Sequence, residues 1–244
     1  MTLFEINSTA RSGHHAMLNW LIKNISGYEY QSYDKLKIIP HGVFYINEAN
    51  FSKELSLDYI SKYNEEIRCL FMSYENSEPN YSILCDNEKY IGPMSINNPN
   101  IKNLDKNYRI IFIRDFYSNL TSRIKHNNDR IKNGEKPLWD VGERFINLWK
   151  DSAKYILDEK CLYLKFEDWL TSKKLRNDFL SKITQNGELY DNNVRGSFSS
   201  FDERTNVIDR FDKEIIPTGI KNLIKNDNEL HYLMGVLGYH YRSI

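Results

Sequence analysis

The chain has 244 residues, and its 33 basic and 33 acidic side chains cancel. No overall electric field therefore favours nucleic acid or an anionic membrane as a partner, and any anion site has to be local. A hydrophobic content of 41% excludes a disordered chain, and the length suits one large α/β domain or two small ones, of which we expect a single domain over residues 1–244.

The cysteines Cys69, Cys85 and Cys161 are odd in number and lack metal-ligand spacing. This usage favours a reducing compartment over a disulfide framework. No cleavable signal precedes the first predicted strand, and no apolar run approaches 18 residues. The sequence therefore predicts a cytoplasmic protein without a membrane partner.

The opening stretch predicts a strand, a tight loop and a helix. Residues 3–7 are apolar-rich, residues 8–13 are small or polar, and from Ala16 the apolar positions recur at helical spacing. Backbone N–H groups at such a turn lack intrahelical partners and lie at the positive end of the helix dipole, so they form an anion site. Arg11 adds a positive charge beside them. The alternative is a purely structural turn, and the loop is not a Walker A sequence, because its glycine spacing and Gly-Lys-Ser/Thr ending are missing.

Two candidate bases follow along the chain. His41 stands between Pro40 and Gly42 in a predicted loop. The unperturbed pKa of a histidine lies near neutrality, which suits a general base. Glu75 comes directly after a predicted buried strand over 67–74, where open parallel sheets place ligand contacts. The alternatives are an exposed loop histidine and a solvated carboxylate. Residues 76–107 predict a loop-rich insertion that covers a cleft.

A central strand is predicted over residues 108–113, where five of six residues are apolar or aromatic. Arg114 then lies at its carboxyl edge, and Ser122 about two turns into the next helix. Such an arginine and hydroxyl can converge on one phosphate. The alternative is an Arg-Asp pair that ends the strand, with Ser122 incidental.

In the remaining part of the chain, predicted helices and strands again alternate. Helical periodicity over 139–158 makes Trp149 a core residue, and residues 161–166 predict another buried strand that runs into the acidic Glu167 and Asp168. A helix is predicted over 172–184, a hydroxyl-rich loop over 193–201, and a final helix from residue 230.

Four of these segments resemble, in the same order, motifs of sulfotransferases that use 3′-phosphoadenosine-5′-phosphosulfate (PAPS). Arg11-Ser12-Gly13 is similar to their 5′-phosphosulfate loop, with His14-His15 where the family usually has Ser or Thr, and Arg114 with Ser122 matches their 3′-phosphate pair. The segment 161–170 resembles their Leu-Tyr-x-x-Tyr-Glu-Asp strand, with Phe166 in place of the Tyr, and 193–201 resembles a loop whose ring lies against adenine. The resemblance implies a three-layer α/β/α sandwich with a mostly parallel central sheet, related to P-loop nucleotide kinases.

The resemblance also implies a function, the transfer of the PAPS sulfuryl group to a hydroxyl or amine with 3′-phosphoadenosine-5′-phosphate (PAP) as product. The resemblance is compatible with a carbohydrate or another hydroxyl compound as acceptor and leaves saccharide, lipid, peptide and small phenol open, and no oligomeric state is indicated. The implied donor-binding residues are Arg11, Ser12, Gly13, His14, His15, Ala16, Arg114, Ser122, Phe166, Ser199, Ser200, Phe201 and Arg210.

The chemistry of the transfer sets the catalytic candidates. Negative charge builds on the departing phosphate, so positioning and electrostatics supply most of the catalysis, and Arg11 is placed to meet that charge. His15, His41 and Glu75 are the candidate bases. No acidic cluster suggests magnesium, so we expect a metal-independent reaction. The rivals are a P-loop kinase or nucleotide hydrolase, and a non-catalytic relative that binds nucleotide or glycan.

Overall fold

The structure is a computed structural model. Its description covers residues 1–27, 37–39, 43–47, 68–77, 79, 105–185, 187–190 and 215–244, with the backbone alone for 37–39 and 43–47.

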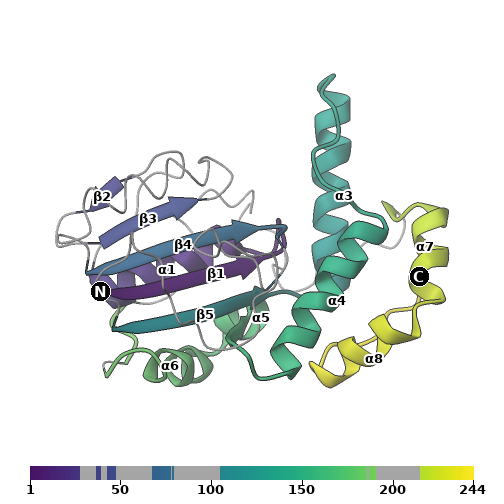
Figure 1. Cartoon of the computed structure of the whole chain (residues 1–244). Coiled ribbons are helices and arrows are strands. Elements are labelled where there is room, and N and C mark those ends of the chain that lie inside the picture. Colours follow the sequence, from purple (N-terminus) through teal and green to yellow (C-terminus); the bar gives the residue numbers. More distant parts are fainter. Residues whose placement is uncertain are drawn as a thin grey trace, which may run out of the picture.

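A six-stranded sheet lies at the centre of these residues, with the strand order β2-β3-β4-β1-β5-β6 (Figure 1). β2 pairs antiparallel with β3, and every other neighbouring pair is parallel. This confirms the predicted α/β class with a mostly parallel sheet. The strands are β1 (Thr2–Ser8), β2 (Lys37–Ile39), β3 (Val43–Asn47), β4 (Cys69–Glu75), β5 (Lys106–Ile113) and β6 (Leu162–Lys165).

The register brings the carboxyl ends of the central strands level with one another. Ser8, the last residue of β1, is aligned with Glu75 of β4 and with Phe112 of β5. Parallel strands place their ligand contacts at this edge. The loops after β1, β4 and β5 are therefore neighbours, although their residues are far apart in the sequence.

The described helices are α1 (His14–Ser26), α3 (Phe116–Lys132), α4 (Glu143–Leu157), α5 (Phe166–Thr171), α6 (Lys173–Ser181), α7 (Thr218–Lys225) and α8 (Asn228–Val236). None of them is long and apolar enough to cross a bilayer.

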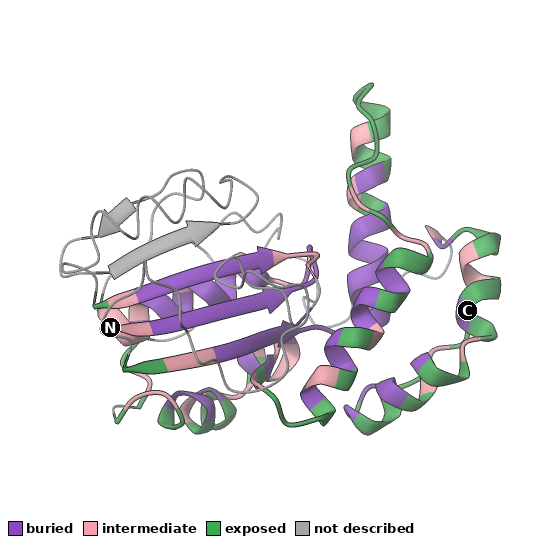
Figure 2. Cartoon of the chain, in the orientation of Figure 1, coloured by how far each residue is buried: buried purple, intermediate pink, exposed green. Residues whose placement is uncertain are grey.

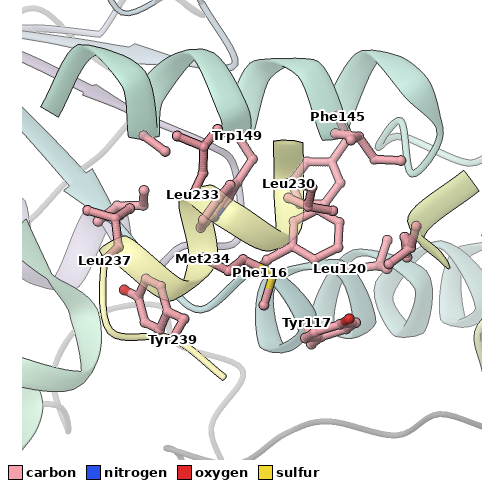
Figure 3. Close-up of a cluster of buried hydrophobic side chains, with 14 of the residues drawn as sticks. Phe116, Tyr117, Leu120, Phe145, Trp149, Leu230, Leu233, Met234, Leu237 and Tyr239 are labelled. Carbon is pink, nitrogen blue, oxygen red and sulfur yellow. The ribbon is translucent and has the colours of Figure 1, made fainter. Parts of the chain in front are cut away.

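Two hydrophobic clusters lie on the two sides of β5. Ile110 and Phe112 join a cluster with α1, α5 and α6, which we call the sheet cluster. Ile111 and Ile113 join a cluster with α3, α4 and α8, which we call the helical cluster (Figure 3). Alternate residues of a strand point to opposite faces, so β5 is covered on both. Figure 2 shows the buried residues concentrated in the central strands and along the inner sides of α3 and α4.

The carboxyl-terminal half of α1 holds a distant part of the chain. Asn24 donates to the carbonyl of Tyr190 at 2.9 Å and accepts from the N–H groups of Leu189 and Tyr190 at 2.9 and 3.0 Å. The Trp20 indole donates to Glu188 at 2.8 Å. Residues 188–190 are thereby fixed against α1.

Within the described residues, the strands predicted over 3–7, 67–74, 108–113 and 161–166 and the helices predicted over 139–158 and 172–184 are present with shifted ends, whereas β2, β3, α5 and α7 were not predicted. α1 begins at His14, two residues before the periodicity indicated, because Gly13 provides the turn into the helix. α4 begins at Glu143 and not near Trp139, because the Asp140 carboxylate accepts from the N–H groups of Gly142 and Phe145 and starts the helix there. Trp149 is fully buried in the helical cluster, which confirms it as a core residue.

Candidate functional site

The loop between β1 and α1 is a tight turn with two left-handed residues, Arg11 at φ 65° and Gly13 at φ 85°. The positive φ at Gly13 favours glycine, and the space around it requires glycine as well. A Cβ at this position would lie 2.3 Å from two ring carbons of Phe166. The first turn of α1 carries no acidic residue, so its N–H groups and the helix dipole present positive charge toward the loop. The buried Ser12 and Ala16 lie in this turn.

His14 is buried beneath the loop and bridges two strands. Its Nδ1 is 2.6 Å from the Ser8 hydroxyl, and its Nε2 is 2.7 Å from the Ser73 hydroxyl of β4. Burial lowers the pKa of His14 well below its usual value of 6.5, so the ring is neutral at pH 7. With both nitrogens bonded to protein hydroxyls, His14 fixes β1 to β4 and presents no ring nitrogen to a ligand.

Arg11, Arg114 and Ser122 come together at the loop. Arg11 Nε is 3.4 Å from the Ser122 hydroxyl, and Arg114 Nη1 donates to the Arg11 carbonyl at 3.1 Å. Burial lowers the pKa of Arg11, and the charges of Glu75 and Asp129 oppose that shift. The sequence predicted an anion pocket at Arg11 and a second at Arg114 and Ser122. The side chain of Arg11 spans both, so the two adjoin.

Arg114 supports the loop from beneath. Its side chain is 1% exposed, and its guanidinium carbon lies 4.8 Å from the centre of the Phe166 ring. The indole of Trp149 donates to its backbone carbonyl at 2.9 Å. In this arrangement Arg114 faces the Arg11 backbone and the Phe166 ring.

His15 and Glu75, two of the three candidate bases, are neighbours. His15 Nε2 lies 3.8 Å from Glu75 Oε1, and the two side chains are 35% and 16% exposed. His15 belongs to the first turn of α1, and Glu75 ends β4. The alignment of Ser8 with Glu75 places both beside the loop.

Asn76 and Arg123 also hold the loop, and sequence reasoning did not identify them. The Asn76 side chain accepts from the N–H of Ala10 at 3.0 Å, and Arg123 Nε donates to the Ala10 carbonyl at 3.2 Å. Arg123 also donates to Asn76 and, at 2.9 Å, to the carbonyl of Asp140. Burial lowers the pKa of Arg123 to about 10, so it stays charged at neutral pH. The available signal was the position of Arg123 on the apolar face of α3, three residues after Leu120.

The residues that directly follow β6, Phe166 and Glu167, support the loop and the start of α3. The Phe166 side chain is fully buried against Gly13, Arg114 and Trp169, so none of its ring is open to an adenine. The Glu167 carboxylate accepts from the N–H of Asp115 at 3.2 Å and from the Tyr239 hydroxyl at 3.1 Å. Burial raises the pKa of Glu167.

Asp115 has its own structural task, because it caps α3 by accepting from the N–H of Ser118 at 2.8 Å. Its carboxylate lies 3.6 Å from Arg242. Asp115 therefore fixes the start of α3, and Asp115 and Glu167 both contact residues near the carboxyl terminus, Arg242 and Tyr239.

Several predicted site residues lie outside the described part of the chain: His41, Ser199, Ser200, Phe201 and Arg210. The same holds for most of the insertion predicted over 76–107. Among the described residues, no group of three or more His, Cys, Asp or Glu side chains could hold a metal ion.

Comparisons with known proteins give only distant likenesses. No protein-family model and no curated protein matches the sequence. The sulfotransferase domain from the curacin biosynthetic pathway is similar in structure, with 14% identity, a TM-score of 0.46 and coverage of 98% of both chains. Mouse sulfotransferase SULT7A1 complexed with PAP is 15% identical, with a TM-score of 0.46 and coverage of 96% of this chain and 84% of that one. Both TM-scores are below 0.5, so neither likeness assigns a function to this chain.

Proposed function

We propose that the chain is a sulfotransferase, which moves the sulfuryl group of PAPS to a hydroxyl or amine of an acceptor. One observation carries the proposal. Arg11, on a loop that opens a helix N-terminus, lies 3.4 Å from Ser122 of α3, 111 residues later. A guanidinium, a hydroxyl and helix N–H groups at one place suit an anionic donor with several phosphate or sulfate oxygens.

The donor's 5′ end is assigned to the loop. Arg11 and the backbone N–H groups of residues 13–16 meet the charge that develops on the bridging oxygen as the bond from sulfur to the departing phosphate breaks, whereas the Ser12 N–H donates to the Thr9 carbonyl at 3.2 Å. His14 is left out of these contacts, because both ring nitrogens are bonded to hydroxyls. The second anion contact is assigned to Ser122. Arg114 positions the Arg11 carbonyl, and its contact with a 3′-phosphate stays a prediction.

The acceptor's proton is assigned to the pair formed by His15 and Glu75. The new bond joins sulfur to the acceptor oxygen or nitrogen, whose proton leaves to a base within reach. An imidazole and a carboxylate 3.8 Å apart place two candidate proton acceptors at one position beside the loop. His41 stays a third candidate.

The reaction is proposed to need no metal. A sulfuryl group carries less charge than a phosphoryl group, and positive charge from Arg11 and the helix N-terminus is already directed at the loop. Titration with magnesium and with a chelator tests this, and turnover should change with neither.

Calorimetry with PAP, AMP and ATP tests the donor assignment. PAP should bind at least about tenfold more tightly than AMP, because a second phosphate adds charge-assisted hydrogen bonds. Ser122→Ala should reduce that preference, whereas Ser181→Ala, which removes an exposed hydroxyl of α6, should leave it unchanged. Equal binding of PAP and AMP contradicts the proposal, and tighter binding of ATP than of PAP supports the kinase rival.

Turnover at saturating PAPS tests the base. His15→Ala, Glu75→Gln and His41→Ala are compared, and the base should lose about 10²-fold or more in kcat. If no variant does so, the base assignment is wrong. Tight PAP binding with no sulfated product from a broad acceptor panel identifies a non-catalytic relative instead.

A further inference from the structure

A cavity of about 140 Å³ lies beside the loop, between the residue after β4, the middle of α3 and the start of α4. Its deep part is formed by the buried side chains of Arg123, Phe145 and Leu148. Trp139 forms a wall, and the exposed Arg144 lies at the mouth.

The cavity adjoins the proposed reaction site. Two of its lining residues, Asn76 and Arg123, hold Ala10 of the loop from both sides. Asn76 directly follows Glu75, whose charge also acts on Arg123. The cavity is therefore connected to Glu75 through the adjacent Asn76 and to the loop through Ala10.

The cavity is positively charged. Arg123 donates three of its five N–H groups to neutral oxygens of Ala10, Asn76 and Asp140. Within the described residues, neither Arg123 nor Arg144 has an ion pair with a carboxylate. The carboxylates of Glu75 and Asp140 attract the Arg123 guanidinium through space, and an anion that accepts its remaining N–H groups would add charge-assisted hydrogen bonds.

The shape and the rest of the lining suit a ring. Phe145 and Leu148 are apolar, and the indole N–H of Trp139 is buried without a hydrogen-bond partner among the described residues. Engineered cavities of about 150 Å³ accept a molecule the size of benzene. The space is therefore sufficient for one six-membered ring.

We propose that this cavity binds the acceptor, and that the acceptor carries a six-membered ring with a carboxylate. The carboxylate is held by Arg123 and Arg144, and the ring lies against Trp139 and Phe145. This inference depends on the proposed sulfotransferase function for the identity of the ligand as acceptor. The ring comes from one of two sources, a hydroxybenzoate or a hexuronic acid, which share the carboxylate.

Binding to the full chain with PAP present tests the inference. The probes are 4-hydroxybenzoate against phenol, and glucuronate against glucose, measured by calorimetry. Within the pair that binds, the carboxylate compound should bind at least about tenfold more tightly than its neutral counterpart. Tighter binding of 4-hydroxybenzoate than of glucuronate identifies an aromatic ring, and the reverse order identifies a sugar.

Arg144→Gln should remove most of the carboxylate preference and leave the affinity for PAP unchanged. Arg144 is exposed, so this variant is expected to fold. The matched control is Arg130→Gln, which removes an arginine of α3 that pairs with Glu135 at 2.9 Å and does not line the cavity. The control should keep the preference.

The outcomes separate this inference from the proposed function. PAP binding without any carboxylate preference, or a preference that Arg144→Gln leaves intact, overturns the inference and leaves the function standing. In the opposite case, the carboxylate preference disappears in Arg144→Gln but the protein does not prefer PAP to AMP. This result keeps the cavity as a site for a ring with a carboxylate and overturns the sulfotransferase assignment.

Discussion

On one side of β5 the helical cluster is held by apolar packing, whereas the loop at the carboxyl ends of β1 and β4 is held by buried polar groups. The cluster brings together Phe116, Trp149, Leu230 and Met234 from α3, α4 and α8 (Figure 3). The loop depends on hydrogen bonds from His14 and Arg123. Apolar packing tolerates swaps between hydrophobic residues of similar volume, whereas a buried polar network is damaged when one donor or acceptor is removed. The two regions should therefore respond to different substitutions.

The largest effect is expected from Arg123→Met. This change keeps much of the volume but leaves the Ala10 and Asp140 carbonyls without the Arg123 donor, and the Asn76 amide oxygen keeps only the Ala10 N–H as donor. Each buried carbonyl left without a donor costs about 1–3 kcal/mol, so the loss for the two carbonyls together should be about 4 kcal/mol, which urea unfolding measures. Arg130→Met, on the exposed part of α3, should cost less than about 0.5 kcal/mol. Equal losses in the two variants contradict the role assigned to Arg123.

Leu230→Ala should cost about 3 kcal/mol, because Leu230 is fully buried in the helical cluster and truncation leaves a cavity. The loss should be the same at pH 7 and pH 5.5, since no titrating group is removed. Leu175→Ala, at an exposed position of α6, serves as the control and should be nearly neutral. A loss at Leu230 that varies strongly with pH would contradict the conclusion that apolar packing alone holds this cluster.

Gly13→Ala should cost about 2 kcal/mol more than Gly134→Ala. Both glycines have positive φ, at 85° and 78°, so both changes strain the backbone. Only the Cβ at position 13 meets the Phe166 ring, at 2.3 Å, whereas the space around Gly134 is open. Thermal unfolding of the two variants gives the difference. Adding Phe166→Leu to Gly13→Ala should recover part of it, and no recovery would exclude the ring as the cause.

The smallest effect is a pH dependence at His14. Its folded pKa lies well below the usual 6.5, so below pH 6.5 the unfolded chain binds a proton that the folded chain does not. Stability from His14 is complete above pH 6.5 and falls by about 1.4 kcal/mol per pH unit below it. The wild-type curve should therefore converge toward that of His14→Gln as the pH falls to 5.5. His126→Gln should retain the His14 contribution, and parallel curves for wild type and His14→Gln would refute it.

Much of the fold could be predicted, because burial leaves a direct trace in the sequence. The apolar runs of β1 and β5 mark strands that are covered on both faces, and the spacing in α4 placed Trp149 in the core. Element ends were less accurate, since they depend on single contacts such as those of the Asp140 carboxylate.

The site was predictable only in part, because its assembly depends on which strands are neighbours. Arg11, Arg114 and Ser122 follow from local patterns, but the strand order decides that Glu75 lies beside His15. The role of Asn76 left no trace in the sequence. His14 shows the opposite error, since a histidine in an anion-binding turn suggested a ligand contact and the structure buries it between Ser8 and Ser73.

The contacts on either side of residues 191–214 have a consequence for chain continuity. Before this segment, Asn24 and Trp20 of α1 fix residues 188–190. After it, Ile216 and Ile224 are already buried in the helical cluster. Each flank is anchored by its own side chains, so fragments 1–190 and 215–244 should reassociate when they are produced separately.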